Sequence, residues 1–348
     1  MNHRERVLAA VRHETPDRIP ISWLALENPA PLLEHLGLDP VLGNDGLGDY
    51  FGADVRMLSA VQADDMFGNA GHGKPYGLDL HRKPFYNAES VKEIEDYAWP
   101  SVDALDFRSL VSYSKNHNFE NSAEHAICIG NWTPVFCEVC DFFTMERTLL
   151  LLYENPKLIE AAVARIEAFY LEYCKRLLKS AAGRAQFFHM WDDFSSQRGL
   201  LMSPDTWRKF FKPTVQKMFA MAKAEGLYVW FHSCGVITEV MPDLIDMGMD
   251  VWETVQAHLE GNDPAFLKKK FGDAITFNGG VSTQSVLPFG TPAQVRAEAR
   301  ERMRVLGESG GYICGPDHMI KRETPLENTL ALYDEIHTFR AQGRTLVK

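Results

Sequence analysis

The chain has 348 residues, of which 45% are hydrophobic and 24% are charged, fractions that exclude disordered and fibrous classes of protein. Its 36 basic and 47 acidic side chains give a net charge of −11, which argues against nucleic-acid binding because that needs a basic patch. No apolar run reaches the roughly 18 residues of a membrane span. The polar N-terminus does not resemble a signal peptide, and six sparse cysteines show no disulfide framework. We therefore expect a cytoplasmic protein.

Eight short apolar runs alternate with longer helical stretches along the chain. The runs cover residues 18–23, 55–59, 126–131, 186–191, 227–232, 250–255, 274–279 and 311–314. Between the later runs, apolar residues recur every three or four positions, as over residues 158–179, which is typical of helices that pack on a sheet. This order predicts an α/β fold, a single (β/α)8 TIM barrel over residues 1–348. A doubly wound open sheet is the alternative.

The connection between the second and third predicted strands, residues 60–125, is too long for a simple loop. It contains four glycines between Gly68 and Gly77 and an acidic segment over residues 89–96. We expect this stretch to be an excursion over the barrel mouth, either a lid or a simple cover.

Residues that follow the predicted strands should be considered together, because the active site of an α/β barrel lies at the C-terminal ends of its strands. Four of these residues are candidates for substrate binding, namely Trp23, Asn131, Trp191 and Gln256. The aromatic side chains, together with Trp132, would suit a flat apolar substrate. They are equally consistent with core packing.

The pattern His232-Ser-Cys234 directly follows the fifth predicted strand. Imidazole and thiolate suit Zn²⁺, and a distant third ligand would leave one coordination position open, as catalytic zinc requires. Cys314, after the last strand, is the expected third ligand. The alternative is that both cysteines and His232 belong to the core.

Asp192 and Asp193 follow the fourth predicted strand and are the candidate catalytic residues. Paired carboxylates at a barrel mouth raise each other's pKa, which suits a general acid. Alternatively, one of the two caps the next helix. Cys137 and Cys140 lie among apolar residues, and we interpret them as core cysteines on one helix face.

Several motifs together resemble the uroporphyrinogen decarboxylase superfamily. They are the opening residues 4–20, Asp192-Asp-Phe-Ser-Ser-Gln-Arg-Gly-Leu-Leu-Met-Ser-Pro204, Phe231-His-Ser-Cys-Gly235, Asn278-Gly-Gly-Val281, and residues 310–320 followed by Thr324-Pro-Leu-Glu-Asn328. The resemblance covers nearly the whole chain and implies a single (β/α)8 barrel. Porphyrin decarboxylases of this superfamily grip propionates with an N-terminal arginine motif. Residues 21–28 contain no arginine, so we do not expect porphyrin decarboxylation.

The chain is more similar to the cobamide-dependent methyltransferase branch, which carries a His-x-Cys…Cys zinc motif. The resemblance implies that His232 and Cys234 are zinc ligands. In that branch the last cysteine follows an Ala-Pro-Gly turn, and a register on Pro316 places His318 there. The third ligand is therefore Cys314 or, as the less favoured alternative, His318.

The resemblance implies methyl transfer between a small substrate and cobalamin, with O-demethylation of a methoxylated aromatic as the favoured reaction. Because the chain lacks an Asp-x-His-x-x-Gly motif, cobalamin should arrive on a partner corrinoid protein. Relatives are often homodimers. The alternatives are a metal-free decarboxylase or lyase, and a non-catalytic barrel that binds corrinoid proteins.

Overall fold

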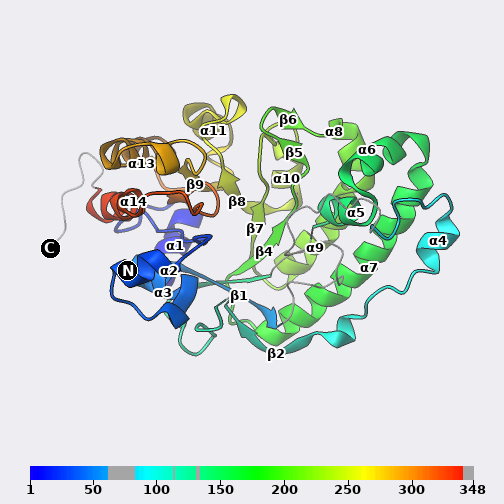
Figure 1. The fold of residues 1–348 in the computed structure, drawn as a ribbon, viewed down its shortest axis with the longest axis horizontal. Helices are drawn as coiled ribbons and strands as arrows, with labels where there is room; N and C mark the ends of the chain where they lie inside the picture. The colour runs from blue at the N-terminus through cyan, green and yellow to red at the C-terminus, as the bar shows by residue number, and fades with distance from the viewer. Residues whose placement is uncertain (62–82, 113, 131–133, 340–348) are drawn as a thin grey trace.

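The computed structural model describes residues 1–61, 83–112, 114–130 and 134–339. Its centre is a sheet with seven parallel strands, whose spatial order is β10-β9-β8-β7-β4-β3-β1 (Figure 1). These strands are β1 (Val55–Val61), β3 (Ala126–Gly130), β4 (Phe187–Trp191), β7 (Tyr228–His232), β8 (Met249–Val255), β9 (Thr276–Val281) and β10 (Tyr312–Pro316). The predicted strands from residue 55 onward are thus confirmed, with small differences in their ends.

The first predicted strand, residues 18–23, is reduced to a single bridge between Ile21 and Cys314. It nevertheless occupies the space between the two ends of the parallel sheet. On one side the N–H of Ser22 donates to the carbonyl of Cys314 (2.8 Å), and on the other the N–H of Asp54 donates to the carbonyl of Ile21 (3.0 Å). Residues 20–22 therefore take the place of the eighth strand of a barrel, in agreement with the predicted (β/α)8 fold.

The interior of the barrel is filled by a small apolar layer. Phe187, Trp230, Val251 and Ile313 pack there, each from a different parallel strand. Helix α1 (His3–Val11) closes the bottom with Val7 and Val11, which belong to the same cluster. Because strand side chains alternate between faces, the residues two positions further along each strand also face inward, one layer nearer the barrel mouth.

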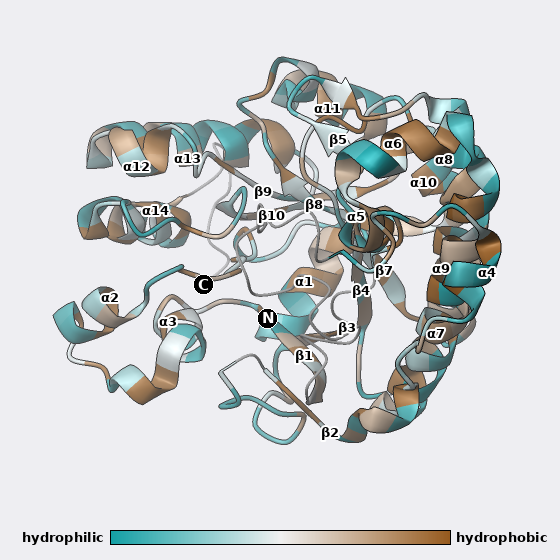
Figure 2. Ribbon diagram, turned by 45° about the vertical axis from the view of Figure 1, so that its right-hand side comes forward, coloured by the Kyte–Doolittle hydropathy of each residue, from teal (hydrophilic) through white to brown (hydrophobic). Residues whose placement is uncertain are grey.

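Helices cover the outer face of the sheet, and their apolar residues join the strands in one large core. Figure 2 shows hydrophobic and hydrophilic residues side by side on helices such as α7 and α14, as expected for helices that bury one face. Among the described residues, no helix is long and apolar enough to cross a membrane. The helices are α2 (Ala30–His35), α3 (Gly43–Tyr50), α4 (Val91–Glu95), α5 (Phe136–Phe143), α6 (Met145–Glu154), α7 (Pro156–Ala181), α8 (Pro204–Phe210), α9 (Lys212–Ala224), α10 (Met241–Met247), α11 (Pro264–Phe271), α12 (Val286–Phe289), α13 (Pro292–Leu306) and α14 (Leu326–Thr338), with short 3₁₀ turns η1 (Pro40–Leu42), η4 (Val102–Ala104) and η5 (Glu260–Asn262).

The described part of the expected excursion runs along the flank of helix α7. The Arg165 side chain donates to the carbonyl of Glu95, Arg176 pairs with Asp103 at 2.7 Å, and the Ser180 hydroxyl donates to the carbonyl of residue 107. The stretch then forms β2 (Asp106–Val111), which pairs antiparallel with β1. This part therefore braces the outside of the barrel, and the rest of the expected cover, residues 62–82, lies outside the described residues.

The carboxylate of Asp54 holds the barrel closed. It is fully buried and accepts hydrogen bonds from the N–H of Ile21 (2.7 Å) and from the guanidinium groups of Arg6 (2.6 Å) and Arg18 (2.7 Å). His3 Nδ1 lies 2.7 Å from the same carboxylate. Burial raises the pKa of Asp54, but the contacts with His3, Arg18 and Ile21 outweigh it and lower that pKa overall. Asp54 thus links α1, residues 18–21 and the start of β1.

We expect Asp54→Ala to lower the free energy of unfolding by roughly 3–5 kcal/mol, because it leaves two partly buried arginines without their carboxylate. Since the pKa of Asp54 is lowered in the folded chain, its stabilisation is present above the ordinary carboxyl pKa of 3.8 and disappears as pH falls through the folded value. Urea unfolding monitored by circular dichroism at pH 7 and at a series of pH values below 3.8 measures both effects. The exposed pair of Asp106 with Arg108 supplies a control, Asp106→Ala, which should unfold like the wild type. Equal midpoints for the two variants would show that Asp54 does not close the barrel.

Candidate functional site

Three polar side chains form the layer above the apolar interior of the barrel. His189 on β4, His232 on β7 and Glu253 on β8 each come two residues after an inward-facing apolar residue. All three are at least nine-tenths buried, and one ligand atom from each lies within 4.8 Å of the others. The strand alternation therefore brings two imidazoles and a carboxylate together at the C-terminal ends of adjacent strands.

Glu253 fixes the orientation of the His232 ring. Its Oε1 lies 2.9 Å from Nδ1 of His232, and its Oε2 accepts a hydrogen bond of 2.5 Å from the indole of Trp230. Burial raises the pKa of Glu253, but the contacts with His232 and His189 outweigh it and lower the pKa to about 2, so the group is a carboxylate. With the Nδ1 proton donated to Glu253, Nε2 of His232 is the atom presented to the barrel mouth.

The atoms presented toward His232 Nε2 come from Cys234 and His318. Cys234 Sγ lies 3.6 Å from that nitrogen, and the ligand atoms of His232, Cys234 and His318 all lie within 4.8 Å of one another. Burial raises the pKa of the Cys234 thiol, but hydrogen bonds from His232 and His318 outweigh it and lower the pKa to about 7. Burial lowers the pKa of His232, whereas its contacts with Cys234 and Glu253 raise it well above the usual value. The cluster thus favours a thiolate on Cys234 beside a protonated His232.

The prediction that Cys314 joins this cluster is wrong. Cys314 follows the inward-facing Ile313, so its side chain points to the opposite face of β10, into the core beneath the outer helices. It is fully buried there, and burial raises the pKa of its thiol to about 12. The chain turns after Pro316, and His318 reaches the site instead. His318, the less favoured alternative from the sequence, is therefore the residue that lies beside His232 and Cys234.

Asp192 and Asp193 have different roles in the structure. The Asp192 carboxylate is fully buried and accepts three backbone hydrogen bonds, from Val135 (3.1 Å), Phe136 (2.8 Å) and Cys137 (3.0 Å), at the start of α5. Burial raises its pKa to about 6 in spite of those three donors. Asp192 thus accepts the backbone N–H groups at the start of α5, a helix that precedes it in the chain, whereas the sequence suggested a cap on the next helix.

Asp193 is half-buried and lies at the candidate site. Its Oδ1 accepts a hydrogen bond of 2.7 Å from the backbone N–H of Cys234. This bond holds the turn that carries the cysteine, so Asp193 contacts the site through the backbone. Its expected role as an acid stays a prediction.

The four predicted substrate-binding residues are dispersed. Trp23 packs against Phe51 and Tyr333 (ring centroids 5.4 and 5.6 Å apart) in the helical layer, so it does not line the cleft described below. Trp191 lies edge-on to the His232 ring at 6.4 Å. Asn131 lies outside the described residues, as does Trp132. Of the three that the structure describes, Gln256 is the residue that lines the cleft.

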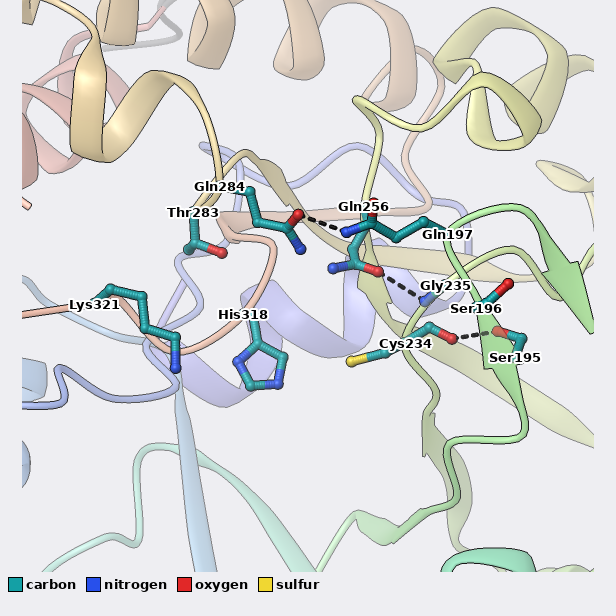
Figure 3. Close-up of a pocket in the computed structure, with 10 residues that line it drawn as sticks. All are labelled: Ser195, Ser196, Gln197, Cys234, Gly235, Gln256, Thr283, Gln284, His318 and Lys321. Carbon is teal, nitrogen blue, oxygen red and sulfur yellow. Dashed lines mark hydrogen bonds between the residues drawn. The ribbon is translucent and has the colours of Figure 1, made fainter. Parts of the chain in front are cut away.

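A cleft of about 330 Å³ opens beside Cys234 and His318 (Figure 3). One wall is the hairpin of β5 (Ser195–Ser196) and β6 (Gly199–Leu200). Gly235 lies so close to this hairpin, with φ +84°, that a Cβ would come within 2.4 Å of the Ser195 hydroxyl. The cleft is lined by Ser195, Ser196, Gln197, Cys234, Gly235, Gln256, Thr283, Gln284, His318 and Lys321.

Several residues of the site and its cleft were not among the residues predicted from the sequence. The sequence could have indicated Glu253, because it is a carboxylate within an apolar strand, two residues after Val251 and therefore on the same face. Gln284 and Lys321 lie in loops after β9 and β10, where no pattern in the sequence indicates the direction of a side chain. Their place in the cleft follows from the way these loops turn at the barrel mouth.

Comparison with curated proteins gives two kinds of relative. Methylcobamide:CoM methyltransferase MtaA of Methanosarcina barkeri is 32% identical over 132 residues, which cover 38% of this chain and 36% of that protein. Uroporphyrinogen decarboxylase of Chlorobium luteolum is 24% identical over 181 residues, which cover 49% of this chain and 46% of that protein. The chain thus spans about a third to a half of the length of these relatives.

Solved structures and protein families extend the similarity to the rest of the chain. A methyltransferase from Methanosarcina mazei superposes with a TM-score of 0.67 at 19% identity and covers 97% of this chain and 98% of its own, which shows a shared fold. The model of the family described as uroporphyrinogen decarboxylase (URO-D) matches residues 123–339. Because this match spans more than half of the chain, the protein belongs to the uroporphyrinogen decarboxylase family.

Proposed function

We propose that this chain is a zinc-dependent methyltransferase that moves a methyl group between a small substrate and the cobalamin of a partner corrinoid protein. The observation that carries the proposal is the convergence of His232, Cys234 and His318 beside an open cleft at the barrel mouth. The similarity to the methyltransferase MtaA, whose name gives methylcobamide and CoM, supports the class of reaction.

The donor set fits zinc. Two imidazoles and one thiolate are ligands that zinc prefers, and three protein ligands leave a fourth position for substrate. The mutual separation of at most 4.8 Å is compatible with three ligands around one ion. Glu253 on the far nitrogen of His232 supplies the carboxylate–histidine arrangement that commonly orients a zinc ligand. Bound zinc would supply Lewis acidity, which holds a substrate thiol as a thiolate or polarises an ether oxygen.

The residues of the chain then have separate tasks. Glu253 holds the His232 ring in the orientation that turns Nε2 to the cleft, and Asp193 holds the turn of Cys234 through its backbone. Asp192 keeps the start of α5 in place. The half-buried Cys234 and His318 border the cleft, so a substrate atom held there would be accessible to a partner at the barrel mouth.

The substrate within this proposal is a methyl ether, such as a methoxylated aromatic, or a thiol. Trp191 lies edge-on to the ring of His232, whereas the residues that line the cleft are mainly of polar types. The methyl group would reach the cleft on a separate corrinoid protein, because the chain carries no cobalamin motif of its own.

The first prediction concerns the metal ligands. We expect the purified chain to hold about one zinc per molecule, and His318→Ala and Cys234→Ala to lose it because each removes one ligand atom. Cys314→Ala is the matched control, since its thiol points away from the site, and it should keep its zinc. Elemental mass spectrometry of the variants measures this directly. Loss of zinc in Cys314→Ala with retention in His318→Ala would reverse the assignment.

The second prediction concerns Glu253. Glu253→Gln keeps the shape of the side chain but removes the charge that orients His232, so zinc affinity should fall roughly 10- to 100-fold. Competition with a chromophoric chelator measures the affinity. An unchanged affinity would show that Glu253 has no part in metal binding.

The third prediction concerns the reaction. The zinc-loaded chain should transfer methyl groups between cobalamin and either aryl methyl ethers or thiols, which the cobalamin absorbance spectrum records. A chelator and the double variant His232→Ala/Cys234→Ala should both abolish the transfer. If the chain instead released CO₂ from a carboxylated substrate in the presence of chelator, the metal-free lyase would be the correct function.

A further inference from the structure

A second cavity lies on the outside of the barrel, where α4 and the chain that follows it run along helix α7 (Figure 1). Residues 99–102 form one side of this outer cavity, and one face of α7 forms the other. Its volume is about 270 Å³, close to the lower end of small-molecule pockets, which is roughly 300 Å³. The outer cavity shares no lining residue with the cleft at the barrel mouth.

The floor of the outer cavity is apolar. Five of its nine lining residues are apolar, and of these Phe169 and Val102 are buried. The indole N–H of Trp99 donates to the carbonyl of Ile94 at 2.8 Å, so Trp99 contributes ring surface to the cavity and not a hydrogen-bond donor. Ala168 is exposed, and its methyl group leaves the space above it open. A surface of this kind packs well against a flat apolar group.

The two arginines that line the outer cavity differ in their partners. Arg176 pairs with Glu172 (2.8 Å) and Asp103 (2.7 Å), and these hydrogen bonds raise the pKa of its guanidinium. Arg165 forms no ion pair with a described residue, and the hydrogen bond that it donates to the carbonyl of Glu95 is long, at 3.4 Å. A guanidinium has five N–H donors, so Arg165 can bind an acidic group without giving up an ion pair within the described part of the chain.

Helix α7 brings this charge and the apolar floor together. Arg165, Ala168 and Phe169 are three and four residues apart, a spacing that places all three on one face of the helix. An exposed arginine alone is an ordinary feature of a protein surface. Here the guanidinium belongs to the lining of a cavity whose floor is apolar, so one ligand can contact both.

We propose that the outer cavity binds a small organic acid, whose flat apolar body lies against Trp99, Ala168 and Phe169 and whose carboxylate pairs with Arg165. Such a ligand would connect α7 to the segment between β1 and β3. Because it binds the folded chain, it would stabilise that chain by mass action. Binding here requires neither the metal nor the reaction proposed for the barrel mouth.

Benzoate and its uncharged counterpart benzamide test the outer cavity in the full chain. We expect benzoate to bind about fivefold more tightly, because pairing with an exposed arginine adds modestly to affinity. Arg165→Met should remove this preference by removing the charge. Ala168→Leu should weaken the binding of both probes, because the larger side chain fills the cavity. Ligand-observed NMR titration measures all four affinities.

Two further positions on α7 supply matched controls. Lys157 and Ala164 are exposed on the same helix but do not line the outer cavity. Lys157→Met removes a positive charge, and Ala164→Leu enlarges a side chain by the same amount as Ala168→Leu. Both variants should bind benzoate and benzamide as the wild type does.

The results decide the assignment whether or not the chain is a methyltransferase. A benzoate preference that is lost in Arg165→Met and kept in Lys157→Met, with weaker binding in Ala168→Leu than in Ala164→Leu, would support it. Equal affinities for benzoate and benzamide, a preference that persists in Arg165→Met, or unchanged binding in Ala168→Leu would each overturn it. Treatment with a chelator should leave the binding at this site unchanged.

Discussion

The buried carboxylate of Asp54 is the interaction on which the rest of the structure depends. A parallel sheet of seven strands leaves two open edges, and here residues 20–22 fill the space between them. Asp54 accepts the Ile21 N–H and pairs with Arg6 and Arg18, so one group joins the start of β1 to the residues that close the ring. The cost of burying this charge is offset because nearly all of its acceptor capacity is used.

Closure of the ring decides which side chains can meet at its mouth. In an open sheet, the ends of β7 and β10 would be separated by the full width of two intervening strands. In the barrel, His318 after β10 comes within 4.8 Å of His232 and Cys234 after β7. The inward-facing layer beneath, with Glu253 on β8, then fixes the ring of His232. The candidate metal site is thus a consequence of closure and of strand alternation acting together.

Although the chain is strongly acidic, the described lining of the cleft contains no acidic side chain. Two carboxylates beside the cleft, Asp317 and Asp193, are directed at backbone and hydroxyl donors of the chain itself. The Oδ1 atom of each is therefore used within the fold.

The sequence by itself determined the positions of the parallel strands, the fold class and the pair His232 and Cys234, because apolar periodicity and a short local motif carry that information. The tertiary structure alone placed His318, and not Cys314, beside that pair, since spacing along the chain does not give the phase of side chains on β10. It also placed the Asp192 carboxylate at the start of α5 and Trp23 in the helical layer. Each of these depends on the direction of one side chain relative to a closed barrel, and that direction is set by contacts between residues far apart in the sequence.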